Sequence, residues 1–96
     1  MKREDILHYL EEHKPEFERK FGVRKIGLFG SYSRDKNHSE SDIDIVVELE
    51  KPDLLALIGI KQMIEEQLNI KVDIVRYRDR MNEMLKKRID RDAQYA

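Results

Sequence analysis

The sequence of 96 residues contains no cysteine. This absence excludes disulfide bonds, thiolate metal sites and cysteine nucleophiles, so any metal ion would have to bind oxygen or imidazole. No apolar run approaches the roughly 20 residues that cross a bilayer, and the first segment, MKREDILHYL, carries charge but no apolar signal core. We therefore expect a cytoplasmic protein that has no membrane partner.

A strong net charge is also missing, because 19 Lys and Arg residues are balanced by 20 Asp and Glu residues. Such a chain lacks the basic field with which nonspecific nucleic-acid binders attract phosphates, so a nucleic acid is not expected as a partner. An apolar fraction of 40% beside a charged fraction of 41% indicates a compact fold with an ionised surface. The length predicts a single domain, residues 1–96.

Apolar residues recur at helical spacing in three segments. The first helix is expected over residues 2–21; Pro15 would kink or divide it, and Gly22 would end it. Its apolar face holds Ile6, Leu7, Leu10, Phe17 and Phe21. A second helix should open after Pro52, with a buried stripe of Leu54, Leu57, Ile58, Ile64 and Leu68. A third should bury Met81, Met84, Leu85 and Ile89.

Three other segments have the composition of strands, namely residues 23–29, 42–49 and 71–77. The clearest is DIDIVVEL, in which β-branched residues alternate with acidic ones. The polar, turn-forming segment GSYSRDKNHSES separates the first two strands and is expected to be a functional loop. Helices and strands in this order predict an α+β fold.

Three aspartates form a candidate metal site. Asp42 and Asp44 are two residues apart on one predicted strand, so their side chains project from the same face. Without a partner the two carboxylates would repel each other, and a hard divalent ion such as Mg²⁺ relieves that repulsion. Asp73 on the next strand is placed to complete the cluster. The alternative without a functional role is that these residues form the solvent-exposed face of ordinary strands.

The start of the predicted loop is a candidate phosphate site. Gly30 has no Cβ to block a phosphate, Ser31 offers a hydroxyl donor, and Arg34 can add a charge-assisted contact. Gly30 and Ser31 are alternatively a turn residue and a helix cap, and Arg34 a solvated surface charge.

The stretch GLFGSYSRDKNHSESDIDIVVE resembles the signature of the DNA polymerase β-like nucleotidyltransferase superfamily: Gly-Ser after a strand, a loop, then Asp-x-Asp on the next strand. Asp73 in KVDIV resembles the third acidic residue, and Arg34 the arginine of the minimal members. Asp35 stands where minimal members often have glycine. The length and the ending RIDRDAQYA resemble the minimal nucleotidyltransferase (MNT) antitoxins paired with HEPN toxins.

This resemblance implies a palm-like fold with a small mixed sheet of about three or four strands flanked by helices. It also implies transfer of AMP from ATP, with Mg²⁺ held by Asp42, Asp44 and Asp73, and the triphosphate bound by Gly30, Ser31 and Arg34. Asp73 would hold a second metal ion or help to deprotonate the acceptor, and the sequence leaves both roles open. In the MNT antitoxins the acceptor is a tyrosine of the HEPN partner.

Two other functions are compatible with the sequence. One is an antitoxin that acts by contact, as a protein-binding module with a weak catalytic site. The other is nucleotidyl transfer to a small molecule or an RNA end. The histidines are not assigned as metal ligands, because no pair has suitable spacing. Tyr32 and Tyr77 are interpreted as packing residues. Tyr32 is alternatively a residue that contacts the nucleotide base.

Overall fold

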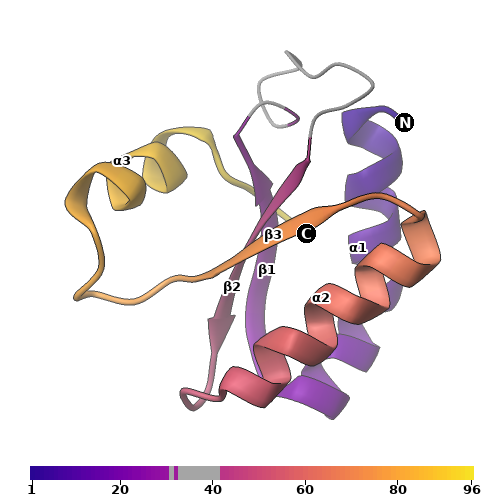
Figure 1. The fold of residues 1–96 in the computed structure, drawn as a ribbon, viewed down its shortest axis with the longest axis horizontal. Coiled ribbons are helices and arrows are strands. Elements are labelled where there is room, and N and C mark those ends of the chain that lie inside the picture. The colour runs from indigo at the N-terminus through magenta and orange to yellow at the C-terminus, as the bar shows by residue number, and fades with distance from the viewer. Residues whose placement is uncertain (31, 33–41) are drawn as a thin grey trace.

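The computed structural model describes residues 1–30, 32 and 42–96, and within them an α+β fold, as predicted (Figure 1). Helices and strands follow one another along these residues in the order α1 (Arg3–Phe21), β1 (Val23–Phe29), β2 (Ile43–Leu49), α2 (Leu54–Leu68), β3 (Val72–Arg76), α3 (Glu83–Asp92) and β4 (Gln94–Tyr95). No helix among them combines the length and the apolar character that a membrane crossing requires.

The strands form one mixed sheet in the order β3-β2-β1-β4. β1 pairs antiparallel with both β2 and β4, whereas β2 pairs parallel with β3. A parallel pair needs a crossover connection, and α2 provides it between β2 and β3. The predicted small mixed sheet is therefore confirmed. β4 was not predicted from the sequence.

Helices cover both faces of the sheet. Ile43, Ile45 and Val47 of β2 point into a core shared with α1 and α2, because alternate residues of a strand face the same way. Val46 points to the opposite face and clusters with Phe29 and Ile89 of α3. Figure 1 accordingly shows α1 and α2 to one side of the sheet and α3 to the other.

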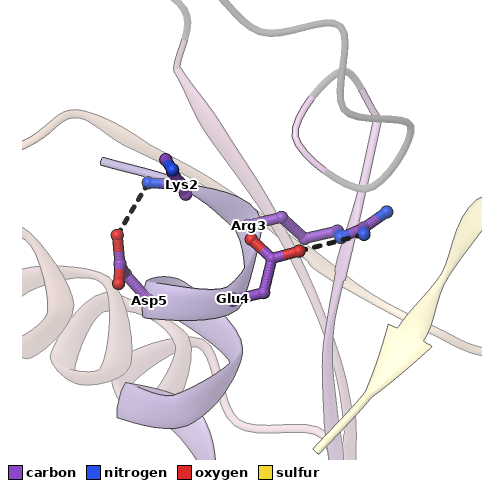
Figure 2. A network of polar contacts seen from close by, with 4 residues as sticks. All are labelled: Lys2, Arg3, Glu4 and Asp5. Atoms are coloured by element: carbon purple, nitrogen blue, oxygen red, sulfur yellow. Dashed lines mark hydrogen bonds and ion pairs between the residues drawn. The ribbon is translucent and has the colours of Figure 1, made fainter.

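α1 is a single helix, and Pro15 neither ends nor divides it. Its N-terminus is capped through Asp5, whose Oδ2 accepts a hydrogen bond of 2.9 Å from the backbone N–H of Lys2, and Arg3 pairs with Glu4 beside it (Figure 2). This satisfies a backbone donor and places a carboxylate at the positive end of the helix dipole. Gly22 ends the helix with a φ of 67°, as expected of a left-handed C-cap.

The buried stripe of α2 differs from the predicted one. Asp53 caps the helix by accepting a hydrogen bond from the backbone N–H of Ala56. Leu54 and Ile58 were predicted to be buried but are 71% and 44% exposed. Ile64 is buried as predicted, Leu57 and Leu68 are partly buried, and the rest of the buried line is Ala56 and Ile60. The helix is thus rotated relative to the predicted face, and its Gly59 lies close to Phe21 of α1.

α3 also buries less than predicted. Ile89 is fully buried, and Met81 and Leu85 pack partly against its cluster. Met84 was predicted to be in the core, but its side chain is 78% exposed. The prediction fails because Met81 lies before α3, which begins at Glu83, so that the helical spacing from Met81 to Met84 does not apply.

Candidate active site

Two of the predicted site residues lie side by side on neighbouring strands. The parallel register of β2 and β3 pairs Asp44 with Asp73. Residues opposite each other in paired strands project from the same face, so the two carboxyl groups share one face of the sheet. Asp44 is half-buried and Asp73 is exposed. Asp42 is exposed and precedes the first residue of β2, outside the strand that was predicted to contain it.

The charges of Asp73 and Asp42 both act on the carboxyl group of Asp44. Burial raises the pKa of the Asp44 carboxyl above its ordinary value, and the charge of Asp73 raises it further. Asp42 acts in the same direction more weakly, whereas the positive charge of Arg88 lowers this pKa. The folded chain therefore gathers negative charge around one half-buried carboxylate, at a cost that a bound cation would offset.

Gly30 makes room for this carboxylate. It follows β1 with a φ of 77°, a conformation that residues with a Cβ rarely adopt. A Cβ at this position would overlap the Oδ2 atom of Asp44. Phe29, the residue before Gly30, is the register partner of Asp44 across β1 and β2. The sequence suggested a glycine here for close approach of a phosphate, and the structure adds the packing of Asp44 as a second reason.

Ser31, Arg34 and Asp35 lie outside the described residues. Their roles in phosphate binding therefore stay predictions from the sequence. His38 lies outside them as well.

The acidic residues provide the kind of ligand that Mg²⁺ prefers, namely carboxylate oxygen. Within residues 1–30, 32 and 42–96, no group of three or more His, Cys, Asp or Glu side chains converges closely enough to enclose a metal ion. Mg²⁺ is commonly bound by one or two carboxylates together with substrate phosphates rather than by a complete protein cage. The neighbouring Asp44 and Asp73 fit that mode of binding.

The model of the nucleotidyltransferase domain family matches residues 10–96. The chain belongs to this family. The matched region includes the Gly-Ser pair, Asp-x-Asp and Asp73, on which the resemblance was based. The predicted family, fold and enzyme class are thus confirmed, and the chain is a nucleotidyltransferase.

Known proteins resemble this nucleotidyltransferase over most of its length. Protein adenylyltransferase MntA of Thermococcus cleftensis is 44% identical over 73 residues, which cover 75% of the chain and 74% of the relative. A solved candidate minimal nucleotidyltransferase has a TM-score of 0.78 at 27% identity, covering 98% of this chain and 95% of its own. A solved complex of a tri-AMPylated Shewanella oneidensis HEPN toxin with an MNT antitoxin contains a similar chain. The TM-score is 0.65 at 25% identity, and the match covers 93% of this chain and 70% of the chain in the complex.

Arg88 of this nucleotidyltransferase was not predicted from the sequence to influence the candidate active site. Arg88 was not among the predicted site residues, yet its positive charge lowers the pKa of Asp44. The only signal in the sequence was that a basic helix follows the strand of Asp73. No local spacing could relate Arg88 to Asp44, because the two residues meet only when α3 folds onto the sheet.

Other residues considered at the site of the nucleotidyltransferase have structural partners. Tyr32 is 2% exposed and belongs to the main core, as the packing interpretation predicted. Tyr77 is partly buried, and its hydroxyl donates a hydrogen bond of 2.9 Å to Asp90. His8 lies 2.9 Å from a carboxylate oxygen of Glu12, and His13 stacks on the ring of Tyr9. Both histidines of α1 therefore have side-chain partners within that helix.

Proposed function

We propose that this nucleotidyltransferase transfers AMP from Mg-ATP to a tyrosine hydroxyl of a HEPN-type partner protein, and that it thereby acts as an antitoxin. The adenylyltransferase name of the Thermococcus cleftensis relative supports AMP as the transferred group. The AMPylated toxin in the Shewanella oneidensis complex supports a HEPN protein as acceptor and a hetero-oligomer as the working assembly. We further propose that residues 1–96 act as one nucleotidyltransferase domain in the cytoplasm.

The observation that carries the proposal is the pairing of Asp44 with Asp73 in the register of β2 and β3. We assign Asp42, Asp44 and Asp73 as the residues that hold Mg²⁺, and Gly30, Ser31 and Arg34 as those that bind the triphosphate. When bound, Mg²⁺ would supply positive charge to the phosphate oxygens. The raised pKa of Asp44 supports this assignment, because crowded carboxylates are more stable beside a cation.

The proposed transfer balances as a displacement at phosphorus. The tyrosine oxygen loses its proton and forms a bond to the α-phosphorus of ATP. The bond between that phosphorus and the oxygen that bridges to the β-phosphate breaks, and pyrophosphate leaves with the electron pair. Asp73 is exposed beside Asp44, so its carboxylate is accessible to accept the proton of the incoming hydroxyl if it does not hold a metal ion.

The test is co-expression and co-purification of this chain with the protein that its neighbouring gene encodes, followed by mass spectrometry of that protein. The native chain should leave AMP on a partner tyrosine when ATP and Mg²⁺ are present. The double variant Asp42→Asn and Asp44→Asn should still form the complex but leave the partner unmodified, because it keeps the shape of both side chains and removes their charge.

Three outcomes would change the proposal. A stable complex without AMP on the partner, for the native chain as well as the variant, would make this protein a binding module. Transfer of label from ATP to a small molecule or an RNA end, with none to the partner, would retain the chemistry and replace the acceptor. Full transfer by the double variant would remove the two aspartates from the metal site.

A further inference from the structure

α3 lies over the face of the sheet that carries Asp44. Ile89 is fully buried in a cluster with Phe29 and Val46. Phe29 is the register partner of Asp44, and Val46 is two residues further along β2 on the same face. The packing of Ile89 therefore holds the middle of α3 beside the candidate active site, on the side of the sheet opposite α1 and α2 (Figure 1).

Arg88 immediately precedes Ile89 and is exposed. It therefore follows the docking of Ile89 onto the Asp44 face of the sheet, and its positive charge lowers the pKa of Asp44. In the part of the chain that the structure describes, Arg88 has no hydrogen bond or ion pair that would occupy its donors. A cation with unused donors among the described residues therefore belongs to the helix that covers the Asp44 face of the sheet, where a triphosphate is proposed to bind.

The neighbouring cations of α3 are placed differently. Arg91 forms an ion pair with Asp92, with Nε 2.9 Å from the Oδ1 atom. The Nζ atom of Lys86 lies 5.7 Å from the ring centroid of Tyr77. Lys87 lines a surface cavity of about 370 Å³, together with acidic residues including Glu83 and Asp90. Of the basic residues of α3, Arg88 is the one whose charge acts on Asp44.

We propose that Arg88 binds the phosphate chain of the nucleotide, and that α3 thus contributes a nucleotide-binding residue to the active site. The inference rests on the proposed function in one respect, namely that a nucleoside triphosphate binds beside Asp44. Three acids and a triphosphate bring more negative charge together than a divalent ion neutralises. The planar guanidinium supplies positive charge and paired donors whose geometry matches phosphate oxygens.

The test measures binding of Mg²⁺ with α,β-methylene-ATP, which cannot transfer AMP, to the full chain by calorimetry. Arg88→Gln should weaken binding by about tenfold to a hundredfold, the range for hydrogen bonds to a charged group. Arg88→Lys keeps the charge but loses the paired donors, so its affinity should fall between those of the native chain and Arg88→Gln. Lys87→Gln is the matched control, since it removes the adjacent charge from the same exposed helix and should leave the affinity nearly unchanged.

Equal affinity of the native chain and Arg88→Gln would overturn the inference. So would a loss of equal size in Lys87→Gln, because that result would indicate a general field of α3 rather than a contact of Arg88. A second titration uses Mg²⁺ alone. If Arg88 only counterbalances the carboxylates, Arg88→Gln should bind Mg²⁺ alone more tightly and the magnesium nucleotide no more weakly, which also contradicts the proposal.

Failure of the proposed function would look different from failure of this inference. If the native chain itself does not bind the magnesium nucleotide, the triphosphate site is wrong and Arg88 loses its ligand with it. If the native chain binds and Arg88→Gln binds equally well, only the role of Arg88 is wrong. Because Arg88 is exposed, the melting temperature of the ligand-free variant should match that of the native chain, and Arg88→Lys provides a second comparison if it does not.

Discussion

Gly30 and Asp44 illustrate how single residues of this chain depend on each other across the sheet. Gly30 has a positive φ, and the space that a Cβ would take is filled by the carboxyl group of Asp44. Gly22 has a positive φ of 67° as well, but a Cβ added there would meet no atom within 4 Å. The two glycines therefore separate the cost of backbone strain from the cost of displacing Asp44.

We predict that Gly30→Ala destabilises the fold more than Gly22→Ala does. Gly22→Ala should cost about 1–2 kcal/mol for the left-handed backbone alone. Gly30→Ala should cost about 1–3 kcal/mol more, because the methyl group overpacks against Asp44. Urea denaturation measures both losses, and nucleotide affinity should fall only in Gly30→Ala. Equal losses in the two variants would show that Asp44 moves aside without cost.

A second prediction concerns Tyr9, whose hydroxyl donates a hydrogen bond to Gln67. Burial raises the pKa of Tyr9 from 10.0 to about 12, and the charge of Glu16 adds to this effect. Below pH 10.0 the hydroxyl is protonated in both the folded and the unfolded chain. As the pH rises from 10.0 towards 12 the unfolded chain loses this proton first, so the free energy of unfolding should fall in this window.

Tyr9→Phe should remove that part of the alkaline loss. At neutral pH the variant should lose about 0.5–1.5 kcal/mol with the hydrogen bond, while the ring still stacks on His13. The measurement is urea denaturation of both proteins at neutral pH and across the alkaline window. Other tyrosines titrate in both proteins, so their contributions cancel in the difference. If the free energy of unfolding falls equally with pH in the two proteins across this window, the prediction is wrong.

At the scale of elements, α2 shows how packing selects a helix face. Gly59 allows α2 to approach α1 closely, because a Cβ there would lie 2.6 Å from the Cε1 atom of Phe21. On the same helix Ala56, Ile60 and Ile64 are buried, whereas Leu54 near the start of the helix is exposed. A hydrophobic stripe counted from the sequence favours the largest residues, whereas close helix packing favours the smallest residue at the crossing.

We predict that Ile60→Ala and Leu54→Ala differ strongly in stability although both remove a large aliphatic side chain from α2. Ile60 is fully buried, so its truncation should cost about 2–5 kcal/mol. Leu54 is 71% exposed, so its truncation should change stability by no more than about 0.5 kcal/mol. Thermal or urea unfolding of the isolated chain measures both. A large loss of stability in Leu54→Ala would indicate that Leu54 is buried, as the sequence predicted.

For the whole molecule, a ligand that binds only the folded state should stabilise the complete domain. With α,β-methylene-ATP and Mg²⁺ at about 100 times the dissociation constant, the gain should be about 2.7 kcal/mol, which raises the melting temperature by about 10–20 °C in a domain of this size. Removing Mg²⁺ with a chelator should abolish the rise. Scanning calorimetry of the same sample before and after chelation gives the comparison.

Asp44→Asn is the control for this effect. It should show no rise with the magnesium nucleotide, because the charge that holds the cation is gone. Without metal its melting temperature should equal or exceed that of the native chain, since the raised pKa of Asp44 means that its charge opposes folding above its ordinary titration range. A full ligand-induced rise in Asp44→Asn would remove this residue from the metal site.

Local patterns in the sequence were sufficient for much of the fold. The helical spacing of α1 and the alternation along β2 arise from residues within a few positions of each other, and the structure confirms both. The order of Gly-Ser, Asp-x-Asp and a later strand aspartate also identified the family, which the match to residues 10–96 confirms. The phosphate-binding roles of Ser31 and Arg34 stay predictions.

Other features depended on residues far apart in the chain, and only the tertiary structure decided them. β4 consists of two residues, too short for any periodicity, and its strand character comes from pairing with Gly27 and Leu28 of β1. The buried face of α2 was set by its packing against α1 and the sheet. The register that places Asp44 beside Asp73, and the packing of Ile89 that brings Arg88 towards them, likewise follow from strand pairing and helix docking. The sequence by itself determined which chemical groups the site contains, whereas tertiary packing determined which of them meet, because distances between separate elements depend on register and crossing rather than on local spacing.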